Sequence, residues 1–287
     1  MTDFPRPPAV AGTFYAPSGA ELAHQLERCF LDPRGPGELP TRHRAPDRTL
    51  RALVVPHAGF EFSGPIAAHA YALLASQRPP ESVLILGVDH QGLGQGPCLS
   101  DRAWLTPLGP METDHALVRA LTRGPVKIDE AALTEEHSIE VQLPFLEYVL
   151  PHPRFVALQV RYDRFDRLVE IGKIVADAVR DRDVLLIAST DFSHYVPARI
   201  AEQLDRLAID AILARDARTL YETVERNDIS MCGIAPTTVL LAALAGESLT
   251  ARLLRWGHSG EAQPMREVVG YAALALETAP GASPPVK

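Results

Sequence analysis

Three histidines of this 287-residue chain stand just after short apolar runs that end abruptly. The run LRALVVP precedes His57, SVLILG precedes His90, and VLLIAST precedes His194. In an open α/β sheet the ligand crevice lies outside the carboxyl ends of the strands, so imidazoles placed there would face one another. Imidazole binds Fe, Cu and Zn and transfers protons near neutral pH. One such histidine alone is best explained as a turn cap, but three together predict a functional crevice.

An acid and a thiol accompany these imidazoles. Asp191 lies in the segment that carries His194, and Cys232 directly precedes an apolar helical pattern. The backbone N–H groups at a helix start favour thiolate, so the pKa of Cys232 is expected to fall. A thiolate binds Fe, Zn or Cu and is also a nucleophile. From spacing alone, a small buried apolar role for Cys232 stays equally open.

The segment Glu135–Glu140 (EEHSIE) is dense in titratable groups. His137 and Glu140 are three residues apart, so they would share one face of a helix. The pair could bind a metal, or it could orient another histidine that binds the metal. The alternative is a solvated helix start, where the helix dipole favours acidic residues.

The apolar runs and the segments between them predict the fold class. The runs are continuous, which suits strands buried on both faces of a sheet. Helical patterns alternate with them along the chain and predict an α/β fold, a three-layer α/β/α sandwich with a central mostly parallel or mixed sheet. Strands are expected at Leu50–Pro56, Ser82–Gly87, Phe155–Val160, Val184–Thr190 and Val268–Leu276. Helices are expected at Gly19–Phe30, Pro65–Leu74, His115–Leu121, Arg164–Arg180, Ala198–Ala214 and Cys232–Leu244.

Composition limits the class of protein. Hydrophobic residues make up 46% of the chain and charged residues 22%, which excludes a mainly disordered protein. The formal charge of −8 argues against a surface for nucleic acid or anionic lipid, and no apolar run approaches the ~18 residues of a membrane span. Three scattered cysteines and the absence of a signal-peptide layout predict a cytoplasmic protein. We expect a single domain over residues 1–287, with an exposed Pro/Gly-rich connection at 32–48 and a flexible tail at 278–287.

Several sequence strings occur together in one order. They are AVAGTFY from Ala9, PHAGF from Pro56, LGVDH from Leu86, EHSIEVQLP from Glu136, STDFSHY from Ser189, and CG from Cys232 with Pro236 after it. PHAG alone is a weak signal, but PHAG, EHSIE-QLP and DFSHY in this order are specific. Over residues 9 to about 274 the chain resembles the Memo family, whose prokaryotic members are also called AmmeMemoRadiSam system protein B.

The resemblance implies a fold and a metal site. The fold would be similar to that of the class III (LigB-type) extradiol dioxygenases, which hold a non-haem Fe(II) at the end of a central sheet. In Memo-like proteins two histidines and a cysteine form the corresponding pocket, and these positions match His57, His90 and Cys232. Fe(II) is the expected metal, with Cu and Zn as alternatives. Asp191 and His194, beside this pocket, are the expected catalytic residues.

The sequence also departs from the family pattern. The family often has two adjacent histidines after the second strand, whereas the second position here is Gln91, which cannot titrate. We expect Gln91, His137 and Glu140 to contact and orient the metal ligands without binding the metal themselves. Dioxygenases of this fold use two histidines and a carboxylate, so Cys232 would stand in place of the carboxylate. A thiolate is softer, favours Zn or Cu(I), and can itself oxidise. Asp191 would restore a carboxylate only if its loop reaches the same centre.

These residues leave three functions open. The first is a metal-dependent oxidoreductase, similar to an extradiol dioxygenase, that acts on an unknown small substrate with His194 as general acid/base. A hydrolytic version would use metal-bound water. The second is a catalytically vestigial metal- or ligand-binding adaptor that works with AMMECR-type and radical-SAM proteins, the partners that the family name implies. The third is thiol catalysis by Cys232, activated by His57 or His194.

Overall fold

The computed structural model describes residues 4–41, 45 and 47–279. Its strands are β1 Leu50–Val55, β2 Ser82–Val88, β3 Cys98–Leu99, β4 Trp104–Thr106, β5 Gly109–Thr113, β6 Lys127–Ile128, β7 Arg154–Val160, β8 Val184–Ser189, β9 His194–Val196, β10 Leu249–His258 and β11 Val268–Thr278. Its helices are α1 Gly19–Leu31, α2 Gly64–Ala75, α3 His115–Leu121, α4 Glu130–Leu133, α5 His137–Glu140, α6 Leu143–Val149, α7 Phe165–Val179, α8 Ala198–Leu213, α9 Ala217–Arg226 and α10 Ile234–Ala243, with a short 3₁₀ helix at Ser259–Glu261.

The strands form a central mixed sheet in the order β10-β11-β1-β8-β2-β7-β3-β6. The four middle strands β1, β8, β2 and β7 run parallel to one another. β11 and β3 join this parallel core in the antiparallel direction. The predicted α/β class with a mostly parallel or mixed sheet is therefore confirmed.

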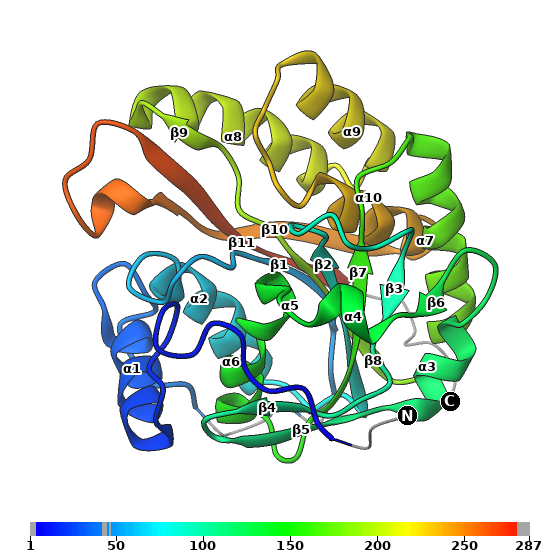
Figure 1. The fold of residues 1–287 in the computed structure, drawn as a ribbon. Coiled ribbons are helices and arrows are strands. Elements are labelled where there is room, and N and C mark those ends of the chain that lie inside the picture. The colour runs from blue at the N-terminus through cyan, green and yellow to red at the C-terminus, as the bar shows by residue number, and fades with distance from the viewer. Residues whose placement is uncertain (1–3, 42–44, 46, 280–287) are drawn as a thin grey trace.

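Helices cover both faces of the sheet, with α7, α8, α9 and α10 on one face and α1, α2 and α6 on the other (Figure 1). Side chains alternate between the faces along a strand. In β1, Ala52 and Val54 pack into the core beneath α7 and α10, whereas Leu53 and Val55 pack against α1 and α2. Continuous apolar strands need cover on both sides, and this arrangement confirms the predicted three-layer sandwich.

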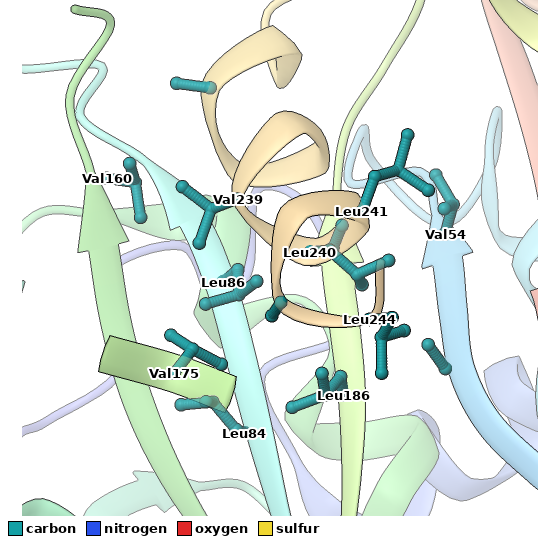
Figure 2. Close-up of a cluster of buried hydrophobic side chains, with 14 of the residues drawn as sticks. Val54, Leu84, Leu86, Val160, Val175, Leu186, Val239, Leu240, Leu241 and Leu244 are labelled. Carbon is teal, nitrogen blue, oxygen red and sulfur yellow. The ribbon is translucent and has the colours of Figure 1, made fainter. Parts of the chain in front are cut away.

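Helix α10 lies at the centre of its layer, against β8, β2 and α7 (Figure 2). Nine of its ten residues are buried, because the sheet and α7 enclose it. Val239 and Leu240 pack beside Leu86 and Leu186 of the sheet (Figure 2). Full burial of one such side chain stabilises the fold by about 1.5–3 kcal/mol. This packing fixes the start of α10, which lies just after Cys232.

The strands and helices expected from the sequence are all present, and each begins and ends within two residues of the expected position. The sequence interpretation missed the long edge strand β10 and the helix α9. It also missed the short elements β3 to β6, α4 to α6, and β9.

The segments expected to be loops lie at the surface or beyond the described part of the chain. The described residues of 32–48 are exposed or half-buried, although the side chain of Arg48 is buried against Asp183. Thr278 still belongs to β11, so that strand extends into the range predicted as a tail. Residues 280–287 of that range lie outside the described residues. In the described part, no helix is both long enough and apolar enough to cross a membrane.

Glu147 of α6 holds a largely buried carboxyl, which accepts a hydrogen bond from Thr106 Oγ1. Burial raises its pKa to about 7, and the bond from Thr106 only partly opposes this effect. A carboxyl whose pKa is raised on folding destabilises the fold as the pH rises through that pKa. We therefore expect the free energy of unfolding of Glu147→Gln, relative to that of the wild type, to increase by about 1–3 kcal/mol from pH 5 to pH 8, after allowance for solvent screening. Urea denaturation at both pH values measures this difference. Glu112→Gln, at an exposed position of β5, is the control. An equal stability difference between Glu147→Gln and the wild type at pH 5 and at pH 8 would contradict this prediction.

Candidate metal centre

His57, His90 and Cys232 lie together at the carboxyl ends of the central strands. His57 follows β1, His90 follows β2, and Cys232 directly precedes the cap of α10. One ligand atom from each residue lies within 4.8 Å of the other two. The Sγ of Cys232 is 3.3 Å from Nε2 of His57, and the two imidazole centroids are 5.2 Å apart. The structure therefore brings together the three residues expected to bind a metal.

The parallel register of β1, β8 and β2 explains why these residues meet. Val55 pairs with Ser189, and Leu86 pairs with Ala188, so the three strands end at about the same level. The loops that follow β1 and β2 then leave the sheet side by side. This is the crevice that parallel α/β sheets offer to ligands.

Two glycines let the surrounding elements approach this crevice closely. A Cβ on Gly87 would lie 2.3 Å from Cγ1 of Ile139, so the glycine is what lets α5 pack directly on β2. A Cβ on Gly233 would lie 2.2 Å from Cβ of Thr190, so the start of α10 can touch the end of β8 only with a glycine there. Both contacts position residues that neighbour the three ligands.

His57 is a neutral, buried imidazole. Its backbone N–H donates to Oδ1 of Asp191 at 2.8 Å, and its Nδ1 lies 2.9 Å from Oγ of Ser189. Burial, followed by the nearby charges of His90 and His137, lowers its pKa well below the ordinary value. A neutral imidazole with Nδ1 engaged has Nε2 left for a metal.

His90 is oriented by Glu136. The Glu136 carboxylate lies 2.9 Å from Nδ1 of His90 and accepts the backbone N–H groups of His90 and Ser138 at 2.9 and 2.8 Å. Burial alone would raise the pKa of Glu136, but the hydrogen bonds from His90 and Ser138 outweigh it and hold the pKa below the ordinary value. A carboxylate that accepts from Nδ1–H leaves Nε2 of the ring to a metal.

Cys232 differs from expectation in its pKa. Burial, followed by the charge of Asp191, raises the pKa of the Cys232 thiol, which the sequence led us to expect to fall. Helix α10 begins only at Ile234, with Gly233 as its cap, so the thiol stands before the first helical N–H groups. The N–H of Asp191 donates to Sγ at 3.2 Å. Without a cation the thiol stays protonated, whereas a coordinating metal would deprotonate it.

Asp191 and His194 lie beside the three ligands and belong to neither metal-binding group found among the described residues. Asp191 is buried, which raises its pKa to about 6, and it holds the backbone N–H of His57. His194 is half-buried, and its Nδ1 lies 2.7 Å from the carbonyl oxygen of Ser230. A carbonyl can only accept, so Nδ1 carries a proton and Nε2 of neutral His194 is free to take another.

Glu140 does not reach the histidines. Its carboxylate accepts hydrogen bonds from Arg6 Nη1, from Tyr15 Oη, and from the backbone N–H groups of Ala9 and Val10. It therefore ties the N-terminal segment, dark blue in Figure 1, across α5. This corrects the expectation that Glu140 orients a histidine, because its two oxygens are used by that segment.

His137 and Gln91 take different places around the centre. The His137 ring stacks on His90 with centroids 4.4 Å apart and planes 17° apart, and the ring of Phe14 contacts His137 with centroids 4.9 Å apart. Burial, followed by His90, lowers the pKa of His137. Gln91 is exposed, and among the described residues it makes no hydrogen bond to the three ligands. The supporting role of Gln91 therefore stays a prediction.

A second group of potential ligands shares His90. One atom each of His90, Glu136 and His137 also lie within 4.8 Å of one another. However, both Glu136 oxygens already accept N–H groups, and Nδ1 of His90 is engaged with one of them. A metal there would break these bonds, whereas His57, His90 and Cys232 can bind without losing them. The arrangement of donors therefore favours the His57/His90/Cys232 group.

The sequence interpretation missed three buried polar residues that support the ligands: Glu136, Ser189 and Gln142. All three lie within strings that carried the family resemblance, Glu136 and Gln142 in EHSIEVQLP and Ser189 in STDFSHY. Their place in these strings was the available signal, since buried polar groups need specific partners.

Comparisons with known proteins bear on the family and the fold. The Memo-like protein family model matches residues 6–275. A MEMO1 family protein of Methanopyrus kandleri is 43% identical over 277 residues, covering 94% of this chain and 98% of that protein. Another, from Methanothermobacter thermautotrophicus, is 40% identical and covers 94% and 99%.

The fold also matches a solved structure. An uncharacterized protein of Escherichia coli K12 superposes with a TM-score of 0.54 and covers 78% of this chain and 99% of that one. At 16% sequence identity this likeness bears on the fold alone. The family model and the curated relatives extend over nearly the whole chain. The chain therefore belongs to the Memo-like family, as its ordered sequence strings predicted.

Proposed function

We propose that this chain binds one divalent metal ion, Fe(II), through His57, His90 and Cys232, and that it is a metal-dependent oxidoreductase acting on a small substrate. Copper is the second candidate metal and zinc the third. The observation that carries the proposal is the meeting of two imidazoles and one thiol within 4.8 Å at the end of a parallel sheet. Three ligands on one side leave open positions for a substrate.

The donors fit a transition metal. In each histidine Nδ1 has a partner of its own, which leaves Nε2 available. Imidazole and thiolate suit iron, copper and zinc, whereas magnesium and calcium prefer oxygen ligands. When bound, the metal would supply a Lewis acid and, for iron or copper, a redox centre.

The residues around the ligands have roles of their own. Asp191 holds the loop of His57 through its backbone N–H. His194, whose Nδ1 faces the carbonyl of Ser230, can take a proton at Nε2 and return it, as a general acid/base. The AMMECR-type and radical-SAM proteins remain the proposed partners.

Metal analysis after anaerobic purification tests the metal site. We expect about one equivalent of iron in the wild type and its loss in His57→Ala and Cys232→Ser, because each removes one of only three protein ligands. His115→Ala and Cys98→Ser are matched controls, the first on the surface and the second with a serine that can keep the contact to the Gly96 carbonyl. Equal metal content in all five proteins would contradict the site.

Oxygen consumption with catechols then separates an enzyme from a binding protein. Turnover that is lost in His57→Ala supports the oxidoreductase, and metal binding without turnover of any catechol supports the adaptor function. For thiol catalysis, the raised pKa of Cys232 predicts that iodoacetamide reacts with it no faster than with Cys29 in metal-free protein. A much faster reaction at Cys232 would favour the thiol function instead.

A further inference from the structure

A buried hydrogen-bond network lies behind His57 and extends beyond the Ser189 hydroxyl that contacts its ring. It contains Ser189 at the end of β8, Gln142 just before α6, and Tyr71 on α2, which are all at most 1% exposed. Two backbone carbonyls, those of Pro56 and Ser138, complete it. The direction of every hydrogen bond in this network can be deduced from these two carbonyls, because a carbonyl oxygen can only accept.

The carbonyl of Pro56 fixes the amide of Gln142. The Gln142 nitrogen Nε2 lies 3.0 Å from the Pro56 oxygen and 2.8 Å from Oγ of Ser189. Only the nitrogen end of the amide can donate to a carbonyl, so Nε2 also donates to Ser189. The oxygen end then accepts the hydroxyl of Tyr71 at 2.6 Å.

The carbonyl of Ser138 fixes the hydroxyl of Ser189. Oγ of Ser189 lies 2.6 Å from that oxygen, so its single proton points there. Oγ has two lone pairs, and one accepts from Gln142. The other faces Nδ1 of His57 at 2.9 Å, and it can only accept.

We infer that Ser189 and Gln142 are positioning residues that hold His57 in the tautomer protonated at Nδ1 and so aim the bare Nε2 at Cys232. Ser189 has no proton left to give, so the ring must donate from Nδ1. The opposite ring nitrogen lies 3.3 Å from the Cys232 sulfur. The network therefore leaves Nε2 of His57 unprotonated and available to a metal already in the metal-free protein. Glu136 has the same effect on His90.

Nitrogen NMR of the metal-free protein tests this inference. Long-range ¹H–¹⁵N correlation of histidine-labelled protein distinguishes protonated from unprotonated ring nitrogens, and His57→Gln identifies the His57 signals. We expect wild-type His57 to be one tautomer with its proton on Nδ1. In Ser189→Ala we expect a mixture or a shift to Nε2–H, because alanine offers no acceptor while the Cys232 sulfur stays within reach.

Tyr71→Phe is the matched control. It removes one buried hydrogen bond of the same network, yet both backbone carbonyls still direct Gln142 and Ser189. The tautomer of His57 should stay unchanged. An Nε2–H tautomer in the wild type, or an unchanged Nδ1–H tautomer in Ser189→Ala, would overturn the inference. The wild-type spectrum decides the first point even if Ser189→Ala does not fold.

Metal titration supplies a second readout, and it alone depends on the proposed function. We expect Ser189→Ala to bind Fe(II) about 10–100-fold more weakly than the wild type and Tyr71→Phe to bind it equally well. Wild-type protein that binds no metal but shows the Nδ1–H tautomer would end the proposed function and still support the tautomer inference. Equal affinity of Ser189→Ala and wild type would mean that the network does not position the ligand.

Discussion

Glu136→Ala is expected to lower the free energy of unfolding by about 2–4 kcal/mol and the metal affinity by about 10–100-fold. The Glu136 carboxylate is fully buried and accepts three N–H groups, two from His90 and one from Ser138. Alanine leaves the buried N–H of Ser138 without an acceptor, at a cost of about 1–3 kcal/mol, and removes the same acceptor from the two partly exposed donors of His90. The ring of His90 also loses the group that keeps its proton on Nδ1.

The neighbouring acid gives the matched control for Glu136. Glu135 is exposed, so Glu135→Ala should change the free energy of unfolding by no more than about 0.5 kcal/mol and leave metal binding unchanged. Urea denaturation of the metal-free proteins measures stability, and Fe(II) titration measures affinity. If the two alanine variants behaved alike, Glu136 would not support His90 as described.

Gly233→Ala is expected to cost about 3 kcal/mol of stability or more, and to weaken metal binding. Its Cβ would lie 2.2 Å from Cβ of Thr190 and 2.8 Å from the backbone oxygen of Ser189, so a strand end or the start of α10 must shift. Overpacking of this kind costs about 1–3 kcal/mol and more where the backbone has to move. The shift would displace Cys232, which directly precedes Gly233 in the chain.

Gly246→Ala controls for the change of residue type. A Cβ at Gly246 would have no heavy atom within 4 Å, so this variant should keep wild-type stability to within about 1 kcal/mol. Thermal or urea unfolding of the two variants side by side measures the difference. Wild-type stability and metal content in Gly233→Ala would show that the start of α10 is not packed against β8 as tightly as described.

The parallel core was predictable because its sequence signal is strong. β1, β2 and β8 are buried along their length and read as unbroken apolar runs. The edge strand β10 gives no such signal. Most of its side chains are only half-buried, and an irregularity in register between Leu253 and Arg255 interrupts the alternation of its two faces. Helix α9 was missed because its sequence is mainly polar, although its two buried residues, Leu220 and Val224, lie four residues apart as on one face of a helix.

The ligand set was predictable from position, because residues that follow parallel strands meet at one edge of the sheet. The identity of the acidic residue that orients His90 could not be predicted in this way. The spacing of His137 and Glu140 was interpreted as one helix face, but α5 has only four residues and Glu136 is its cap. A cap side chain turns back toward the helix start, and here this brings Glu136 to His90.

The pKa of Cys232 shows a second limit of sequence reasoning. The helix dipole acts within the first turn, so an error of two residues in the helix start removes the expected effect. Burial, which no single sequence reports directly, then decides the direction of the shift.

X-ray absorption spectroscopy of the anaerobically purified protein tests most directly whether one metal sits between His57, His90 and Cys232. The account predicts a first coordination sphere with one sulfur and two imidazole nitrogens, and loss of the sulfur contribution in Cys232→Ser. A metal surrounded only by oxygen and nitrogen in the wild type, with the same spectrum in Cys232→Ser, would contradict it.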